Sequence, residues 1–387
     1  MSTSRVILHL DLDAFFCAVE EIKDPGLRGK AFAVGGSPSG RGVVTSCSYP
    51  ARKLGVRSAM PTAKALQLCP NLILVSRNHR DYGRYSNLVM EQLALVSDQV
   101  EQISIDEAFL DITDLGPSPK AIGIKLQQTI LRELDLPNSV GIASNKLVAK
   151  IATDVGKMAA RGDRPPNAIT IVPAGEERSF LAPLPVDMLW GVGPKTKERL
   201  ERYNIHTIGD LASYPDVQLA KKFGKHGYDL SRRSKGIDNR DIVTERGVKS
   251  VSNERTFAED LGRKSEVQKY ITRLSEQVAK RLQKKSLRGK TVQIKLRWSD
   301  FTTLTRQSTL PQTTNKFKVI QQTAADLLDQ VWQEGRKVRL VGVGVHNLDT
   351  NAHQLGLWDT GVQKDIKLQE SLKALRENMG RMSYPRG

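Results

Sequence analysis

Residues 6–21, VILHLDLDAFFCAVEE, decide the architecture of the first part of the chain. Val6–Leu10 is an apolar run of strand length, and from residue 13 to residue 21 the apolar residues recur at helical spacing. The pattern predicts a strand that turns into a helix. Asp11 and Asp13 lie at the junction, and a charge that directly follows a buried strand is costly unless it is paired.

A second acidic segment, SIDEAFLDI (104–112), places Asp106 and Glu107 where two predicted strands meet. A divalent metal is one way to stabilise these carboxylates, and two Mg²⁺ ions about 3.5–4 Å apart can promote phosphoryl transfer. Taken singly, the acids also fit a simpler interpretation. In that interpretation Asp13 caps the helix, Asp106 begins a turn and Glu107 faces solvent.

Length and charge limit the classes of function. The chain has 387 residues, enough for several domains of about 100–200 residues, and its formal net charge of +17 favours nucleic acid as a partner, with an anionic membrane surface second. No stretch approaches the roughly 20 apolar residues of a membrane span, and the start does not resemble a signal peptide, so we expect a cytoplasmic protein that does not bind membranes. The cysteines and histidines show no metal-ligand spacing, which argues against a zinc hydrolase.

The pattern changes in the second half of the chain. From residue 186 onward short helices are punctuated by glycine, and residues 236–249, GIDNRDIVTERGVK, are polar without apolar periodicity, which predicts a tether. The segment that follows predicts the order β-α-β-β-α-β. Residues 246–345 contain 21 Lys and Arg against 9 Asp and Glu, so an excess of 12 positive charges lies in this one unit.

Four motifs occur in the order and rough spacing of the Y-family translesion DNA polymerases: LDLDAFFCAVEE (10–21), SYPARKLGV (48–56), SIDEAFLDI (104–112) and VGIASNKLVAKIATD (140–154). The chain resembles that family, and in particular its bacterial branch, over nearly its whole length. The resemblance implies an α+β multidomain fold of the right-hand polymerase type, with a helix-hairpin-helix thumb and a β-α-β-β-α-β little finger. The implied boundaries are palm 1–10 and 78–168, fingers 11–77, thumb 169–235, linker 236–249, little finger 250–346 and C-terminal tail 347–387.

The resemblance assigns roles to the acids. It implies that Asp11, Asp106 and Glu107 are catalytic ligands of two Mg²⁺ ions, with the backbone carbonyl of Leu12 as a further ligand and Mn²⁺ as an alternative ion. For Asp13 we keep the helix-cap hypothesis.

The resemblance also assigns residues to the nucleotide site. In the family an aromatic side chain shortly after the first metal ligand excludes the 2′-hydroxyl of a ribonucleotide, and Phe16 has that position here. Without the flanking motif, Phe16 would be interpreted as a core aromatic. We give that core role to Phe15. Tyr49, Arg52 and Lys157 match residues that bind the triphosphate. The loop after Lys157 is longer than usual in the family, so Lys150 and Arg161 are alternatives.

Two regions are expected to hold primer-template DNA. WGVGPKT (190–196) resembles a helix-hairpin-helix, in which Gly191 and Gly193 would allow close approach of a phosphate and Lys195 would add charge. In the basic unit, strand alternation could place many cations on one DNA-binding face. The residues concerned are Lys249, Arg255, Lys295, Arg297, Arg306 and Arg339.

HQLGLWD (353–359) is similar to the peptide with which bacterial polymerases bind the sliding clamp. The anchoring residues would be Gln354, Leu355, Leu357 and Trp358. A tail that packs on its own protein is the alternative.

These observations predict a monomeric, low-fidelity DNA polymerase for translesion synthesis that adds deoxynucleoside triphosphates to a primer and lacks a proofreading exonuclease. Two other classes remain open at this point. A two-metal nuclease or nucleotide cyclase could use the same carboxylates, although Phe16, Tyr49 and Arg52 favour a bound triphosphate. A DNA-binding or clamp-tethered scaffold would need only the basic unit.

Overall fold

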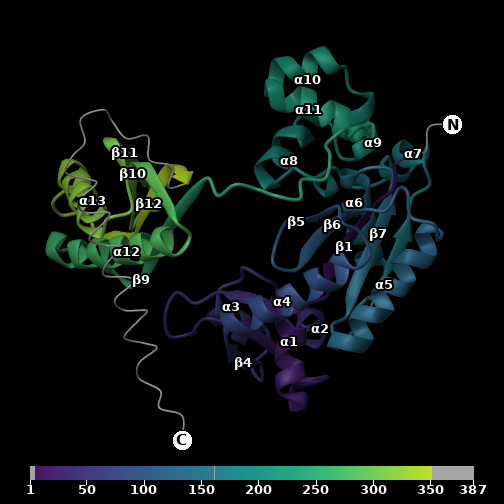
Figure 1. Ribbon diagram of the computed structural model, residues 1–387, viewed down its shortest axis with the longest axis horizontal. Coiled ribbons are helices and arrows are strands. Elements are labelled where there is room, and N and C mark those ends of the chain that lie inside the picture. Colours follow the sequence, from purple (N-terminus) through teal and green to yellow (C-terminus); the bar gives the residue numbers. More distant parts are fainter. Residues whose placement is uncertain (1–4, 161, 351–387) are drawn as a thin grey trace, which may run out of the picture. The chain divides into compact units, whose positions relative to one another are not determined.

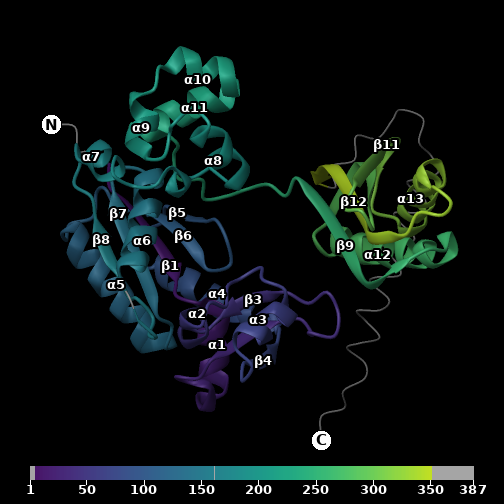
Figure 2. The same ribbon diagram turned by 180° about the vertical axis from the view of Figure 1, so that it is seen from behind.

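The computed structural model describes residues 5–160 and 162–350 (Figures 1 and 2). The chain divides into two compact units, of which the first ends at Gly247 and the second begins at Val248. Each unit has an apolar core of its own. Across these described ranges, every helix is either too short or too polar to cross a bilayer.

A five-stranded sheet forms the centre of the first unit, in the order β5-β6-β1-β7-β8. The middle strand pairs antiparallel on both sides, and its apolar residues alternate between the two faces: Leu8 and Leu10 belong to one core cluster and Ile7 to another. Because both faces are covered, this strand is a nearly continuous apolar run. The strands are β1 (Ile7–Leu12), β5 (Val100–Gln102), β6 (Glu107–Asp111), β7 (Asn138–Ala143) and β8 (Ile169–Ile171).

Helices supply the residues that cover this sheet. Three of them, α1 (Phe15–Lys23), α4 (His79–Ala94) and α5 (Pro119–Leu134), share the core cluster of Leu8. Helix α1 is part of that cluster through Phe15, so no break in the core accompanies the predicted palm–fingers boundary at residue 10. Helix α6 (Lys146–Ala159) packs with Ile7 in the other cluster.

The chain between α1 and α4 folds into a small lobe with its own core cluster and a three-stranded sheet of order β3-β2-β4. Ser48 starts the helix that follows β3, because its hydroxyl accepts the N–H of Ala51. At Gly42 the chain approaches itself so closely that a Cβ would lie 2.2 Å from the Ser37 carbonyl oxygen. The elements are η1 (Pro25–Leu27), β2 (Phe32–Gly35), β3 (Val44–Cys47), α2 (Tyr49–Lys53), α3 (Thr62–Leu68) and β4 (Ile73–Ser76).

The glycine-punctuated segment after β8 consists of short helices, as predicted. They share the core cluster of α6, in which Leu200 and Leu211 join Leu147 and Ile151. The segment therefore rests on the face of the sheet that α6 covers. Its elements are α7 (Glu177–Leu181), η2 (Val186–Met188), α8 (Pro194–Glu201), α9 (Ile208–Ser213), α10 (Asp216–Phe223) and α11 (Lys225–Ser234).

The second unit confirms the predicted order β-α-β-β-α-β. Its four strands form an antiparallel sheet of order β11-β10-β12-β9, and its two helices share one apolar cluster with alternate residues of these strands. The elements are β9 (Ser250–Leu261), α12 (Lys264–Lys284), β10 (Leu287–Trp298), β11 (Thr303–Thr314), α13 (Phe317–Val331) and β12 (Val338–Thr350).

The predicted tether is fixed to the first unit over most of its length. Glu101, only 1% exposed, accepts hydrogen bonds from Lys146 Nζ (2.8 Å) and from the Val243 N–H (2.9 Å), and it pairs with Arg246. Lys146 also donates to the Asp241 carbonyl at 2.6 Å. Burial opposes the charge of Glu101, but these partners hold its pKa below the usual range. A free link is thus confined to the few residues around Gly247.

Lys146→Met should leave the buried carboxylate of Glu101 without its buried ammonium partner, and should cost about 3 kcal/mol of unfolding free energy at neutral pH. Because the pKa of Glu101 is lowered in the folded state, its contribution is present above the unfolded pKa and is lost as the pH falls. The difference between variant and wild type should therefore shrink below about pH 4. Urea unfolding of the full chain at several pH values measures both effects.

Lys280→Met is the matched control, since Lys280 forms an exposed ion pair with Glu276 on α12. Its effect should be at most about 0.5 kcal/mol. Equal effects of the two substitutions would contradict the anchoring role of Glu101.

Candidate active site

The predicted acids meet at the ends of β1 and β6. The antiparallel register places Asp11 directly opposite Glu107, and the Leu12 N–H donates to the Asp106 carbonyl at 3.0 Å. The two strands lie side by side in the middle of the sheet, so residues almost a hundred positions apart become neighbours. The side chain of Glu107 is 23% exposed, so it does not simply face solvent as the simpler interpretation supposed.

Helix α6 brings two ammonium groups to these carboxylates. Lys157 Nζ contacts Asp11 and lies 3.1 Å from Asp13 Oδ1, whereas Lys150 Nζ lies 3.0 Å from Glu107 Oε2. The two lysines are seven residues apart, about two helical turns, and thus share one face of the helix. The carboxylate of Asp106 accepts instead from Ser104 Oγ at 2.6 Å.

The positive charge near these carboxylates is too small to balance their negative charge. Burial raises the pKa of Asp11 to about 7, because the Lys157 ammonium offsets only part of the desolvation cost. Burial also raises the pKa of Asp154, on the same helix. Glu107 differs: burial opposes its charge, but the nearby His9 ring and Lys150 lower its pKa to about 2.

Carboxylate oxygens are the donors that Mg²⁺ prefers. Five carboxylates and two ammonium groups interact in this cluster, so a divalent cation would be electrostatically favoured. Within residues 5–160 and 162–350, no three His, Cys, Asp or Glu side chains converge on one point as a ready metal cage. Asp11 and Glu107 are paired instead with Lys157 and Lys150 of α6.

The predicted nucleotide-site residues lie on α1 and α2. Phe16 is partly buried and stacks on Tyr82 with ring centroids 4.3 Å apart, whereas Phe15 is 2% exposed in the core, as predicted. On α2 the Arg52 guanidinium lies 4.6 Å from the centre of the Tyr49 ring and donates through Nε to the Cys47 carbonyl at 3.0 Å. Burial raises the pKa of the Tyr49 hydroxyl, and the nearby charges of Asp13 and Asp11 raise it further.

The helix-cap prediction for Asp13 is wrong. Helix α1 starts after Ala14, whose backbone is left-handed (φ 47°), and no side chain caps it. Asp13 is 1% exposed and instead accepts from Ser139 Oγ (2.9 Å) and from the Asn167 N–H (3.0 Å). Its carboxylate joins β1 to β7 and to the loop before β8. No signal near Asp13 in the sequence indicated these distant partners.

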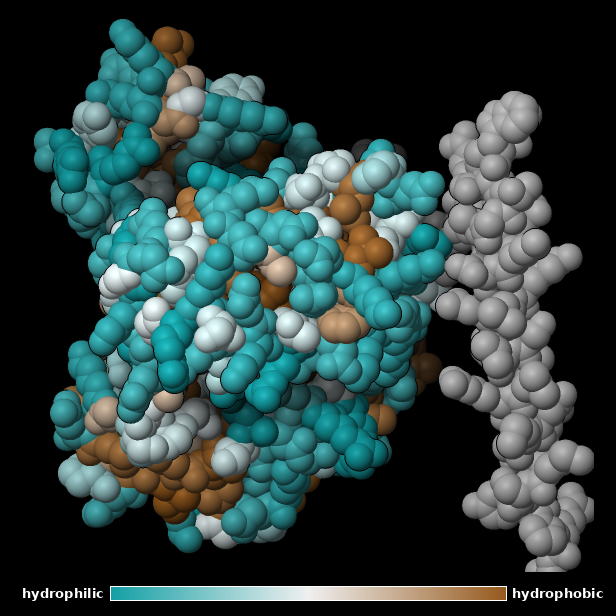
Figure 3. Space-filling model, turned by 90° about the vertical axis from the view of Figure 1, so that its left-hand side faces the viewer, coloured by the Kyte–Doolittle hydropathy of each residue, from teal (hydrophilic) through white to brown (hydrophobic). Residues whose placement is uncertain are grey.

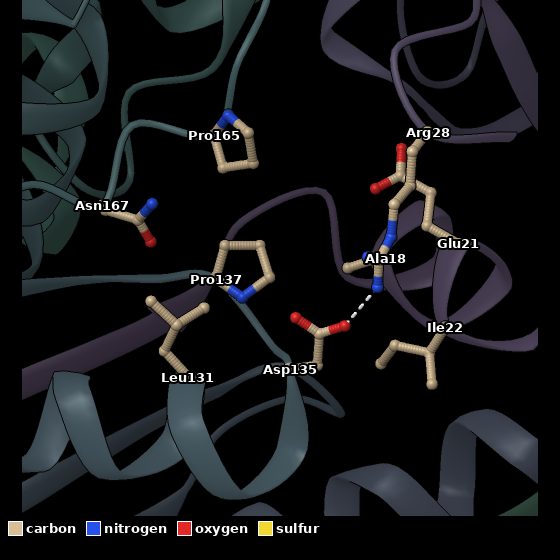
Figure 4. A pocket seen from close by; sticks show the side chains of 9 residues that line it. All are labelled: Ala18, Glu21, Ile22, Arg28, Leu131, Asp135, Pro137, Pro165 and Asn167. Atoms are coloured by element: carbon tan, nitrogen blue, oxygen red, sulfur yellow. Dashed lines mark hydrogen bonds and ion pairs between the residues drawn. The ribbon is translucent and has the colours of Figure 1, made fainter. Parts of the chain in front are cut away.

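Two hollows border the site. The larger, about 400 Å³, lies between Lys150 and Asp154 of α6 and the loop that contains Gly191 and Gly193. The smaller, about 180 Å³, lies beside Asn167 and is crossed by an Arg28–Asp135 ion pair (Figure 4). None of the three predicted metal ligands lines either hollow, but the larger one is lined by Lys150, which pairs with Glu107.

The helix-hairpin-helix residues have the expected local form. Gly191 has a positive φ of 105°, and a Cβ there would lie 2.9 Å from Arg233 Nη1. Gly193 precedes the first turn of α8, where Pro194 stands, and Lys195 is exposed.

The cations of the second unit do not share one face, contrary to the prediction. Lys295 and Arg297 alternate with buried Ile294 and Leu296 on β10 and lie on the face away from the helices. Arg306 pairs in register with Ile294 and therefore lies on the helix side, at the edge strand β11.

Three of the predicted cations remain: Arg255, Arg339 and Lys249. Arg255 stands opposite the core residue Val341 on the other edge strand, β9, and Arg339 stacks on Phe301 at 4.4 Å. Lys249 is exposed just before β9.

Hydrophilic residues predominate on the face of the molecule in Figure 3. Arg161 and the four residues Gln354, Leu355, Leu357 and Trp358 lie outside the described residues.

Family comparisons agree with this geometry. The impB/mucB/samB family matches residues 10–154, its C-terminal domain matches residues 248–357, and the thumb domain of DNA polymerase-iota matches residues 187–238. Similar curated proteins are the DNA polymerase IV of Listeria innocua serovar 6a, 41% identical over 90% of this chain and 96% of that protein, and the DNA polymerase IV of Streptococcus pyogenes serotype M5, 38% identical over 92% and 97%.

Solved structures give the same result. A Y-family DNA polymerase chimera, Dbh-Dpo4(243-245)-Dbh, has a TM-score of 0.78 at 27% identity, and DinB from Sulfolobus solfataricus has a TM-score of 0.61 at 26% identity. Each comparison covers 89% of this chain and all of the other. The polymerase-type fold predicted from the motifs is thereby confirmed.

Asp13→Asn should weaken the connection between β1, β7 and the loop at Asn167, because a charged acceptor is replaced by a neutral one. We expect a loss of about 2 kcal/mol in unfolding free energy and faster exchange of the Asn167 amide proton. Urea unfolding and hydrogen exchange measure these effects. The control is Asp24→Asn, which changes an exposed carboxylate that accepts the Gly26 N–H. It should reduce the unfolding free energy much less.

Proposed function

The chain belongs to the impB/mucB/samB family of Y-family DNA polymerases, and from this membership we propose that it is a low-fidelity enzyme of translesion synthesis. DNA polymerase is the activity of its family, and DNA and nucleotides are its substrates. The reaction proposed is in-line attack of a primer 3′-hydroxyl on the α-phosphate of a deoxynucleoside triphosphate. The observation that carries the proposal is the register that places Asp11 of β1 opposite Glu107 of β6, with Asp106 directly before that strand and bonded through its carbonyl to the Leu12 N–H.

We propose that these three carboxylates, with the Leu12 carbonyl, hold two divalent ions, with Mg²⁺ preferred and Mn²⁺ as a substitute. Such ions would activate the primer hydroxyl and neutralise charge on the triphosphate. The fit is supported by the oxygen-donor set and by the excess of carboxylates over ammonium groups. Lys157 contacts Asp11 and Lys150 contacts Glu107, so each lysine is within reach of a triphosphate that approaches the acids.

The remaining substrate contacts follow from α1 and α2. Phe16 is proposed to exclude the 2′-hydroxyl of a ribonucleotide, since its ring is fixed by stacking on Tyr82. Tyr49 offers a hydroxyl donor, and Arg52 offers a planar guanidinium suited to phosphate oxygens. Lys157 is proposed as the third triphosphate residue, ahead of Lys150.

DNA is proposed to bind in two places. In the first unit the Gly191 and Gly193 loop with Lys195 would contact backbone phosphates. In the second unit Lys295 and Arg297 offer an open sheet face, and the other predicted cations add charge at its edges and ends. These additional residues are Lys249, Arg255, Arg306 and Arg339.

We retain as proposals a monomeric cytoplasmic enzyme without proofreading and a sliding-clamp contact through residues 354–358. The nuclease, cyclase and scaffold hypotheses are set aside, because relatives that match almost the whole chain are DNA polymerases.

Asp106→Ala should reduce primer extension at least about a hundredfold, because a ligand of the proposed ions is lost. Wild type should extend a labelled primer with deoxynucleotides and not with ribonucleotides, and Phe16→Ala should admit ribonucleotides. Gel analysis of primer extension with Mg²⁺ measures all three. DNA binding by Asp106→Ala should persist, and full activity of that variant would remove Asp106 from the mechanism.

Deletion of residues 353–358 should abolish stimulation of synthesis by a bacterial sliding clamp and spare basal synthesis, because tethering raises local concentration without a role in chemistry. Primer extension with and without a clamp loaded on the template tests this. Unchanged stimulation would refute the clamp contact and favour a tail that packs on its own protein.

A further inference from the structure

His9 is a buried polar side chain that the proposed reaction leaves without a role. It lies two residues before Asp11 on β1, is 0% exposed and stands opposite Phe109 of β6, with ring centroids 4.8 Å apart. Residues two apart on a strand share a face, so the imidazole lies on the same face as the Asp11 carboxylate.

The two ring nitrogens of His9 have different surroundings. Nδ1 lies 2.9 Å from the Thr153 hydroxyl on α6. Nε2 has no hydrogen-bond partner, although buried polar atoms are normally satisfied, and it faces Glu107 Oε2 at 3.8 Å. The orphaned atom is therefore aimed at a carboxylate that we assign to metal binding.

One proton decides which nitrogen donates. A neutral imidazole has hydrogen on one nitrogen and a lone pair on the other. If Nδ1 carried the hydrogen, the Nε2 lone pair would face the Glu107 carboxylate, and the two would repel each other. The Thr153 hydroxyl also lies 3.2 Å from the Ala149 carbonyl and 3.4 Å from the His9 carbonyl, but its contact with Nδ1, at 2.9 Å, is the shortest of the three. If Thr153 donates to Nδ1, the Nε2 hydrogen faces Glu107 and the interaction is attractive.

We propose that His9 is a positioning residue for Glu107: the Thr153 hydroxyl donates to Nδ1, and the Nε2–H that results attracts the Oε2 atom of the carboxylate across 3.8 Å, which favours one orientation of that carboxylate toward a divalent ion. Lys150 contacts the same oxygen at 3.0 Å, so both restraints act on Oε2. The restraint from His9 does not depend on Lys150. Partners of this kind commonly orient metal ligands. The inference rests on the proposed metal role of Glu107.

The tautomer is the first test, and it needs neither metal nor activity. Nitrogen-15 spectra of the full chain labelled at histidine should show His9 with a protonated Nε2 and an unprotonated Nδ1, the signal being assigned by its loss in His9→Gln. A protonated Nδ1 would overturn the proposal. Thr153→Val should mix the two tautomers, whereas Thr323→Val, which removes an equivalent hydroxyl bonded to the carbonyl four residues earlier on α13, should change nothing.

Metal affinity is the second test. Electron paramagnetic resonance should follow Mn²⁺ binding to the complex with primer-template DNA and a non-hydrolysable deoxynucleotide. His9→Phe keeps a ring but no donor and should weaken binding about 10–100-fold. His9→Gln, whose amide nitrogen can occupy the position of Nε2, should restore most of it, and kcat should fall in His9→Phe with little change in the KM for nucleotide.

Controls separate the two proposals. His206→Gln, at an exposed histidine, should leave Mn²⁺ affinity unchanged. Glu107→Gln should lose affinity, and if it does not, the metal role of Glu107 fails independently of the tautomer result. Folded His9→Phe with wild-type affinity would refute the positioning role. If His9→Phe does not fold, the positioning role of His9 would be refuted by His9→Gln and Glu107→Gln weakening Mn²⁺ binding equally.

Discussion

Carboxylates gathered at the ends of two central strands form the constraint on which the first unit depends. Asp11 and Glu107 face each other in register, and Asp13 is buried beside them. Carboxylates this close to one another and this far from water repel strongly unless cations accompany them. Helix α6 meets that need with Lys150 and Lys157 on a single face.

The position of α6 is accordingly fixed by charge and by packing together. Leu147 and Ile151 belong to the core cluster that also contains the short helices after β8, so the helix joins the sheet to that segment. Its first residue, Lys146, pairs with Glu101 and anchors the chain that leads out of the first unit. One helix thus connects the acids, the core and the exit segment.

The two units differ in the charge that they carry. The first concentrates negative charge where metal ions and a triphosphate are proposed to act, and the second carries most of the chain's positive excess. Of the cations predicted to bind DNA, Lys295 and Arg297 of β10 lie on the open face of the sheet. Phosphate contacts of this kind position a duplex without reading its sequence, which suits an enzyme that must accept any template.

The sequence alone determined the features that are local. The apolar run Val6–Leu10 indicated β1, regular spacing indicated α12, and the four motifs indicated the acids, because each signal lies within a few consecutive residues. Tertiary structure alone decided the partners of Asp13, which are Ser139 and Asn167, and the attachment of the predicted tether to Glu101. It also decided on which face Arg255 and Arg306 lie. Those outcomes depend on strand register and on helix docking between residues far apart in the chain, and no local pattern of residue types encodes either.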